Sequence, residues 1–136
     1  IPGVLAFPCS TQNELNGDDA KGLVENGCIL VAEGANMPCT PEAVNYFLEK
    51  KVLFAPAKAA NAGGVAVSGL EMQQNAGLER WSFQDVDNRL HEIMRGIHDT
   101  CVHYSKKYDS ESNYVLGANV GGFLRVAQAM VSHGVL

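Results

Sequence analysis

The chain has 136 residues, of which 46% are hydrophobic and 18% are charged, and its formal net charge is −5. This balance excludes an intrinsically disordered chain and supplies enough apolar side chains for one buried core. No apolar run approaches the roughly 20 residues that a membrane-spanning helix needs, and no Lys/Arg cluster indicates nucleic-acid binding. We therefore expect neither a membrane nor a nucleic acid as a partner.

The first half of the sequence predicts strands that alternate with helices. Uniformly apolar runs at 4–7, 28–32 and 52–55 are typical of parallel strands that are covered on both faces. Asn16 and Thr40 are helix N-caps, so two helices are expected between the strands, the first ending at Gly27. Strand, helix, strand, helix, strand is a βαβαβ unit with right-handed crossovers. The expected buried stripes of the two helices are Ala20, Leu23 and Val24, then Ala43, Val44, Phe47 and Leu48.

The second half predicts helices only. One helix is expected from about 61 to 79, and Ser82 begins a second, long helix with Asp85 as its capping-box partner. A polar loop at 109–113 precedes a last helix from about 119 to 133, which Gly134 ends. The expected buried positions are Phe83, Val86, Leu90, Ile93, Ile97, Cys101, Tyr104 and Tyr108, then Val120, Phe123, Leu124, Ala127, Met130 and Val131.

The predicted fold class is therefore α/β, a partial Rossmann-like parallel sheet (βαβαβ) followed by C-terminal helices. We expect residues 1–60 to form the second half of a nucleotide-binding domain and residues 61–136 to form the helices. In an open parallel sheet, ligands bind beyond the carboxyl ends of the strands. The segments that follow the three strands, at 8–13, 33–38 and 56–65, are rich in small residues and amides. They are expected to converge on one rim.

The third of these segments leads into a stripe of residues with helical spacing. Asn61, Gly64, Val65 and Ser68 are three or four residues apart, so a helix would place them on one face. That face offers an amide, bare backbone, an apolar wall and a hydroxyl, which suits a small polar ligand carrying a carboxylate or carboxamide. The same residues also fit a packing role, in which the glycines allow close helix–sheet contact and Ser68 bonds to a backbone carbonyl. Spacing alone does not separate the two interpretations.

Five other residues are weaker candidates for chemistry. His91, His98 and Cys101 share the long helix, and His98 and Cys101 have the spacing of a metal pair, but no further ligand is evident. A packed thiol beside a surface histidine is the favoured interpretation. Lys58 is expected to be solvated or paired with a carboxylate rather than catalytic. Glu33 is expected to orient its own loop by hydrogen bonds.

The four cysteines, Cys9, Cys28, Cys39 and Cys101, include no C-x-x-C pair. A chain with this aliphatic content needs no disulfides for its core, and the first residues carry no signal-peptide pattern. We therefore expect reduced thiols in a cytoplasmic protein rather than two disulfides.

Several segments of this chain closely resemble hexameric glutamate dehydrogenase. They are Pro8-Cys9-Ser10-Thr11-Gln12-Asn13-Glu14-Leu15, Glu33-Gly34-Ala35-Asn36-Met37-Pro38, Ala59-Ala60-Asn61-Ala62-Gly63-Gly64-Val65, Ser68-Gly69-Leu70-Glu71-Met72, Gln74-Asn75, Asn113-Tyr114-Val115 and Gly117-Ala118-Asn119. The resemblance covers essentially the whole chain, and the spacing between the segments also fits. The sequence at 33–38 resembles that of the NADP-dependent bacterial enzymes.

The resemblance implies the reversible oxidative deamination of L-glutamate to 2-oxoglutarate and ammonia, with NADP, or alternatively NAD, as the cofactor. It implies that Ser68 binds the side-chain carboxylate of the substrate, and that Val65 and Gly64 line the substrate pocket. The implied cofactor-binding residues are Asn61, Asn36, Gly34, Ala35, Thr11 and Gln12. No metal site and no catalytic residue is implied within this segment.

The family's catalytic lysine, glutamate-binding lysines and Gly-rich phosphate loop have no counterpart in this sequence. With Ile1 in place of an initiator Met, this absence indicates a C-terminal portion of a longer, homohexameric enzyme, inactive without the N-terminal part. Two alternatives remain. One is a non-enzymatic βαβαβ module that binds a small acid or nucleotide. The other is a different amino-acid dehydrogenase, with a pocket that differs at the position of Ser68.

Overall fold

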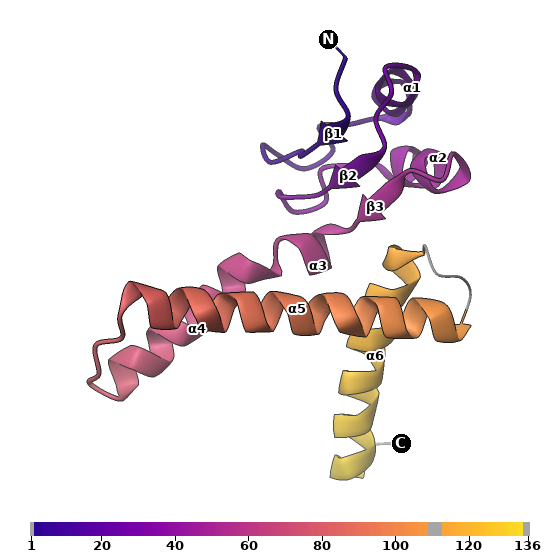
Figure 1. Ribbon diagram of the computed structural model, residues 1–136. Helices are drawn as coiled ribbons and strands as arrows, with labels where there is room; N and C mark the ends of the chain where they lie inside the picture. Colours follow the sequence, from indigo (N-terminus) through magenta and orange to yellow (C-terminus); the bar gives the residue numbers. More distant parts are fainter. Residues whose placement is uncertain (1, 109–112, 135–136) are drawn as a thin grey trace.

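The computed structural model describes residues 2–108 and 113–134 as a small α/β layer followed by long helices (Figure 1). The sheet has three parallel strands in the order β1-β2-β3, so the predicted βαβαβ unit followed by helices is confirmed. The elements are β1 (Leu5–Ala6), α1 (Gly17–Glu25), β2 (Leu30–Ala32), α2 (Pro41–Glu49), β3 (Leu53–Ala55), α3 (Ala57–Ala60), α4 (Ala62–Ala76), α5 (Phe83–Tyr108) and α6 (Tyr114–His133).

The core lies between one face of the sheet and helices α1 and α2. Val31 of β2 and Phe54 of β3 point to this face and are buried against Ala20 of α1 and against Ala43 and Phe47 of α2. The rings of Phe47 and Phe54 stack with centroids 5.9 Å apart. Both crossovers of a right-handed βαβαβ unit lie on the same side of the sheet, which is why this face is covered so completely.

The described residues cover the opposite face of the sheet only in part, so the prediction of strands covered on both faces is not met within them. Leu5 and Leu53, which are in register with Leu30 on this face, are 53% and 54% exposed. Helices α5 and α6 reach only the β3 side, where a cavity of about 340 Å³ separates Leu30 and Leu53 from His98 and Tyr114. The apolar strand pattern therefore indicates a face that the described residues cover only in part.

The N-termini of α1 and α2 follow from their capping residues. Asn16 Oδ1 accepts a hydrogen bond from the backbone N–H of Asp19 at 3.1 Å, and the Asp19 carboxylate accepts one from Asn16 N–H at 3.0 Å. Thr40 Oγ1 accepts a bond from the N–H of Ala43 at 3.3 Å. Gly27, just beyond α1, has φ of +88°, the left-handed conformation that the prediction of a helix stop requires.

The helical half begins and ends close to where the sequence predicts. The helix expected from 61 to 79 is α4, which begins after Asn61 and ends at Gly77, and the short helix α3 that precedes Asn61 was not predicted. Ser82 and Asp85 form the predicted capping box: Ser82 N–H donates to the Asp85 carboxylate and Asp85 N–H donates to Ser82 Oγ, both at 3.2 Å. Gly134 ends α6 with φ of +74°, as predicted.

The prediction for the start of the last helix was wrong by five residues. Helix α6 begins at Tyr114, with Asn113 Oδ1 accepting a bond from Leu116 N–H at 3.0 Å. Gly117, which precedes the predicted helix start, is buried inside α6. A Cβ at this position would collide with the carbonyl oxygen of Cys101 on α5. Glycine at 117 therefore allows the two helix backbones to touch. Residues 109–112 of the predicted loop lie outside the described residues.

Among the predicted seam residues of α5 and α6, only Cys101 is fully buried, where α5 crosses α6 at Gly117. Figure 1 shows the two helices crossing. Phe83 and Tyr108, at the two ends of α5, are exposed, as are Phe123, Met130 and Val131 on α6. These five residues were predicted to be buried. A crossing covers a short stretch of each helix, and the ends of a 26-residue helix extend beyond it. Within the described part of the chain, no helix is both long and apolar enough to span a membrane.

Candidate functional site

The segments after β1 and β2 are joined by backbone contacts. The N–H groups of Gly34 and Ala35 both donate to the carbonyl oxygen of Pro8, at 2.9 and 3.0 Å. A Cβ at position 34 would collide with the Sγ of the exposed Cys9, so glycine lets the two loops approach without displacing that side chain. The first and second loops thus form one continuous surface at the carboxyl ends of the strands.

The segment after β3 joins the same surface through an amide pair. Asn61 Nδ2 donates to Asn36 Oδ1 at 2.7 Å and to the carbonyl oxygen of Ala35 at 3.3 Å. Asn61 stands between α3 and α4, and its side chain makes no hydrogen bond to the N-terminus of α4. Its amide reaches the second loop instead. The three loops therefore converge on one rim, and four of the residues singled out in the sequence, Gly34, Ala35, Asn36 and Asn61, lie together there.

Glu33 stands directly below this rim. It is only 5% exposed, its Oε1 accepts a bond from Cys39 N–H at 3.2 Å, and its Oε2 accepts one from Ala57 N–H at 2.7 Å. Its predicted role as an orienter of its own loop is confirmed. No local sequence pattern indicates the second bond, which reaches 24 residues along the chain to the start of α3. Burial, and then the nearby negative charge of Glu33, raise the pKa of the Cys39 thiol to about 12, so Cys39 stays protonated.

The stripe on α4 is open to solvent. Val65 is 78% exposed, and a Cβ added at Gly64 would meet nothing within 4 Å. Ser68 Oγ donates to the carbonyl oxygen of Gly64 at 3.1 Å, the backbone bond that the packing interpretation expects. Gly63 faces the other way, where a Cβ would lie 3.2 Å from Leu90 Cδ1 of α5. The close contact of this glycine pair is therefore with a helix and not, as that interpretation expected, with the sheet.

Thr11 and Gln12 lie on the first loop and are both exposed. Gln12 lines a cavity of about 440 Å³ with Glu33, Met37 and Phe54 among its other walls. Helix α4 leads away from the sheet in Figure 1, and Val65 and Ser68 follow Asn61 along this helix. The predicted site residues therefore form an extended surface rather than one enclosed pocket.

Lys58 is exposed, which agrees with the expected solvated lysine, and the alternative of a carboxylate partner is not met. Its Nζ donates to the side-chain oxygen of Asn119 on α6, so its partner is an amide and not a carboxylate. The lysine is exposed, and with Arg125 it borders a cavity of about 540 Å³ between α3, α5 and α6. Lys58 therefore connects the short helix that carries the rim to the last helix of the chain.

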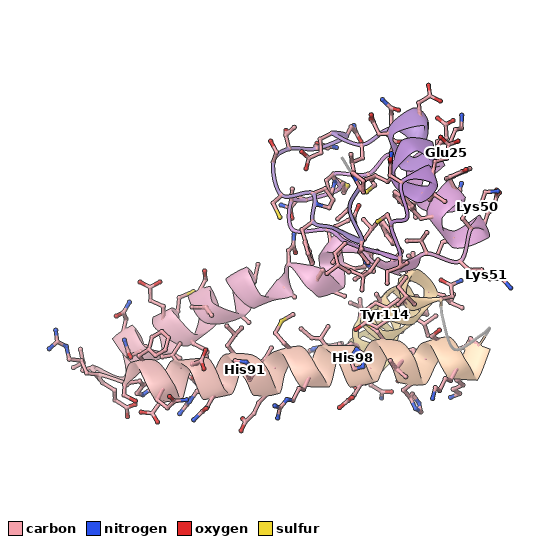
Figure 2. The ribbon with its side chains drawn as sticks, turned by 45° about the horizontal axis from the view of Figure 1, so that its top comes forward. Glu25, Lys50, Lys51, His91, His98 and Tyr114 are labelled. Atoms are coloured by element: carbon pink, nitrogen blue, oxygen red, sulfur yellow. The ribbon has the colours of Figure 1, made fainter. Side chains whose placement is uncertain are left out.

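The histidines on α5 do not converge on a metal site. His98 Nδ1 lies 2.9 Å from the hydroxyl of Tyr114, and Figure 2 shows these two side chains together, with His91 farther along the same helix. Cys101 is buried, which confirms the packed thiol. Burial, and then the neighbouring Cys101, raise the pKa of Tyr114 to about 12. Among the residues that the structure describes, no three His, Cys, Asp or Glu side chains could jointly hold a metal ion, and all four cysteines are free.

Tyr114 is a contact residue that the sequence analysis missed. Because the last helix was expected to begin at about 119, no element was predicted for Tyr114, and its contact with His98 was not expected. Asn113 was the available signal, since asparagine is a preferred N-cap and three non-polar residues follow Tyr114.

Comparison with known proteins places these observations in one family. A sequence profile of the glutamate/leucine/phenylalanine/valine dehydrogenases matches residues 2–134. The chain is 57% identical over its whole length to an NADP-specific glutamate dehydrogenase of Salmonella typhimurium, and 55% identical over 97% of its length to an NAD-specific glutamate dehydrogenase of Bacteroides fragilis. In both cases it spans only 30% of the relative. The crystal structure of Plasmodium falciparum glutamate dehydrogenase superposes on the whole chain with a TM-score of 0.96 at 49% identity, using 29% of that protein.

Proposed function

The chain belongs to the glutamate/leucine/phenylalanine/valine dehydrogenase family, and from that membership we propose that it is the C-terminal part of a glutamate dehydrogenase. The proposed reaction is the reversible oxidative deamination of L-glutamate to 2-oxoglutarate and ammonia. The observation that carries the proposal is the rim, where three loops bring Gly34, Ala35, Asn36 and Asn61 together at the carboxyl ends of parallel strands. In parallel sheets this edge is the usual place for a nucleotide cofactor.

The substrate side of the proposed site is the exposed stripe on α4. Ser68 would bind the side-chain carboxylate of glutamate, and Val65 and Gly64 would line the pocket around its carbon chain. In the structure the Ser68 hydroxyl donates to Gly64, so binding a carboxylate requires the hydroxyl to turn its proton toward the ligand. A hydroxyl at this position supports glutamate over the apolar substrates of the other dehydrogenases in the family.

The cofactor side of the proposed site is the amide pair and its loops. The bond between Asn61 and Asn36 uses the amino group of the first and the oxygen of the second. The Asn61 oxygen and the Asn36 amino group can therefore bind a nicotinamide carboxamide or ribose, with Gly34 and Ala35 beside them and with Thr11 and Gln12 at the border. The cofactor, when bound, accepts hydride from the substrate. We propose NADP because the sequence at 33–38 resembles that of the NADP-dependent bacterial enzymes. Relatives named for NAD and for NADP are almost equally similar to the whole chain.

The remaining parts of the reaction are assigned to the part of the enzyme that precedes this chain. We propose that residues 1–60 complete a nucleotide-binding domain and that residues 61–136 return to the substrate domain, in a homohexamer. The exposed leucines on the open face of the sheet and the exposed aromatic residues of α5 and α6 support this proposal, because such surfaces are commonly covered by another part of an enzyme.

The test compares substrate and cofactor kinetics in the full-length enzyme. Ser68→Ala is expected to raise the KM for glutamate at least about tenfold and to leave the KM for NADP within about twofold, because a lost charge-assisted hydrogen bond costs about 1.5–3 kcal/mol. Ser132→Ala is the matched control, since its hydroxyl also donates to the carbonyl four residues earlier in a helix. The 136-residue chain alone is expected to be inactive. Glutamate-dependent NADPH production by that chain, or equal effects of the two variants, would contradict the proposal.

A further inference from the structure

Glu33 is the only charged side chain that is buried within the described residues. Both of its oxygens are used by backbone donors: Oε1 by Cys39 N–H at 3.2 Å and Oε2 by Ala57 N–H at 2.7 Å. Its own backbone N–H donates to Ala55 at the end of β3. Ionised carboxylates only accept hydrogen bonds, so two converging N–H donors match this group and no other common side chain of its size.

The carboxylate connects the two chain segments that carry the amide pair. Asn36 follows Glu33 by three residues, and Asn61 follows Ala57 by four. The two segments are therefore joined beside the sheet by the Glu33–Ala57 bond and at the rim by the bonds of Asn61 to Asn36 and Ala35. The backbone bond from Glu33 to Ala55 continues the sheet up to this point, so the Glu33 carboxylate is the side-chain link between the sheet and the start of α3.

We propose that Glu33 is a positioning residue for the cofactor side of the site, setting the placement of Asn61 relative to Asn36. The inference rests on the proposed function, because it needs a nicotinamide cofactor to bind at these amides. Glu33 touches neither substrate nor cofactor in this proposal. Glu33 acts through α3, and the later residues of the stripe, from Gly64 onward, lie beyond the segment that Glu33 holds.

Glu33→Gln is the sharpest change, because it keeps the shape of the side chain and replaces one acceptor oxygen by an amino group. Whichever way the amide turns, Cys39 N–H or Ala57 N–H loses its acceptor. In the full-length enzyme we expect the KM for the cofactor, and the Kd for NADH or NADPH from fluorescence titration, to rise about tenfold, as for one lost buried hydrogen bond. The KM for glutamate should change less than about twofold, since a wall of the substrate pocket carried by α4 is not anchored by Glu33.

Two controls separate positioning from simple loss of stability. Phe47→Leu disturbs the core under α2, away from the rim, and should lower the melting temperature without changing the ratio of the two KM values. Glu42→Gln makes the same chemical change at an exposed carboxylate at the start of α2. It should change neither the melting temperature nor the ratio of the two KM values. If Glu33→Gln and Phe47→Leu change the KM ratio equally, the positioning role is refuted.

A double-mutant cycle with Asn61→Ala tests whether Glu33 acts through that amide. If it does, Asn61→Ala should weaken NADH binding much less in the Glu33→Gln background than in the wild type, whereas additive effects would refute the proposal. Glu33→Asp, which keeps the charge but shortens the reach, replaces Glu33→Gln if the latter does not fold, and misfolding of both would make Glu33 a folding residue. A wild-type enzyme without glutamate-dependent activity would refute the proposed function, and NADH titration of the same variants would still decide the role of Glu33.

Discussion

The two halves of the chain differ in how they bury their apolar side chains. In the α/β half, the side chains of Val31, Phe47 and Phe54 are almost completely enclosed between α1, α2 and the sheet. In the helical half, Phe83 is 84% exposed and Phe123 is 68% exposed. The first half thus builds a core of its own, while the second half places long helices across one another and leaves much of their apolar surface open (Figure 1).

Apolar side chains therefore have different roles in the two halves of the chain. The enclosed side chains stabilise the layer that supports the rim, whereas the exposed ones form surfaces that are typical of contacts with another part of a protein. The rim lies at the boundary, where α3 and Asn61 connect the two halves. Its geometry should therefore depend on the core of the first half more than on the apolar residues of the second.

Phe47→Ala and Phe123→Ala are the strongest test of this contrast, because both remove a phenylalanine ring from the middle of a helix. Phe47→Ala is expected to lower the free energy of unfolding by about 3–5 kcal/mol, since it leaves a cavity against Phe54. Phe123→Ala is expected to change it by no more than about 0.5 kcal/mol, as for most surface substitutions. Urea unfolding followed by circular dichroism measures both. Comparable losses would show that the helical half has a core of its own.

The parts of the fold that the sequence predicts correctly are those with local causes. Asn16 with Asp19, Thr40 with Pro41, and Ser82 with Asp85 each determine a helix start within a few residues, and each was predicted at the right place. The burial of Phe123 was predicted wrongly, because periodicity shows which residues share a face and does not show whether another element covers that face. The exposed outer face of the sheet has the same explanation.

The candidate site shows a similar division. The segments that contain Gly34 and Asn61 were singled out because they follow strands, and the structure brings these segments together. The bond from Glu33 to Ala57 could not be predicted, because it depends on the register between β2 and β3 and no local pattern records it. The early start of α6 was not predicted, and the burial of Gly117 inside this helix could not be predicted either, because it depends on the close approach of α5.

Gly117→Ala tests whether the crossing of α5 and α6 determines what the helical half does bury. The added methyl group would collide with the Cys101 carbonyl, so the helices must separate, and we expect a loss of about 1–3 kcal/mol. Gly122→Ala, on the same helix, meets nothing within 4 Å and should stabilise the chain by about 0.5–1 kcal/mol through helix propensity. Thermal unfolding of the two variants gives the comparison. A Gly117→Ala variant as stable as Gly122→Ala would mean that the crossing is not tightly packed.

The smallest expected effect is a pH dependence at the same crossing. Burial raises the pKa of Tyr114 from 10.0 to about 12, and the neighbouring Cys101 and Asp99 add to the shift. Below pH 10 the tyrosine is protonated in both the folded and the unfolded chain, so its contribution to stability is complete. Between pH 10 and 12 the unfolded chain loses the proton while the folded chain retains it, so the free energy of unfolding falls as the pH rises.

Tyr114→Phe isolates this contribution because it keeps the ring and removes only the hydroxyl that contacts His98. At pH 8 the variant should be less stable than the wild type by about 1 kcal/mol, the value of one hydrogen bond. Toward pH 12 the difference in stability should disappear, since the variant has no tyrosine proton to lose at this position. Urea midpoints measured from pH 8 to 11.5 test this. Parallel curves would show that the Tyr114 hydroxyl is open to water, and that the crossing, like the ends of its helices, buries little.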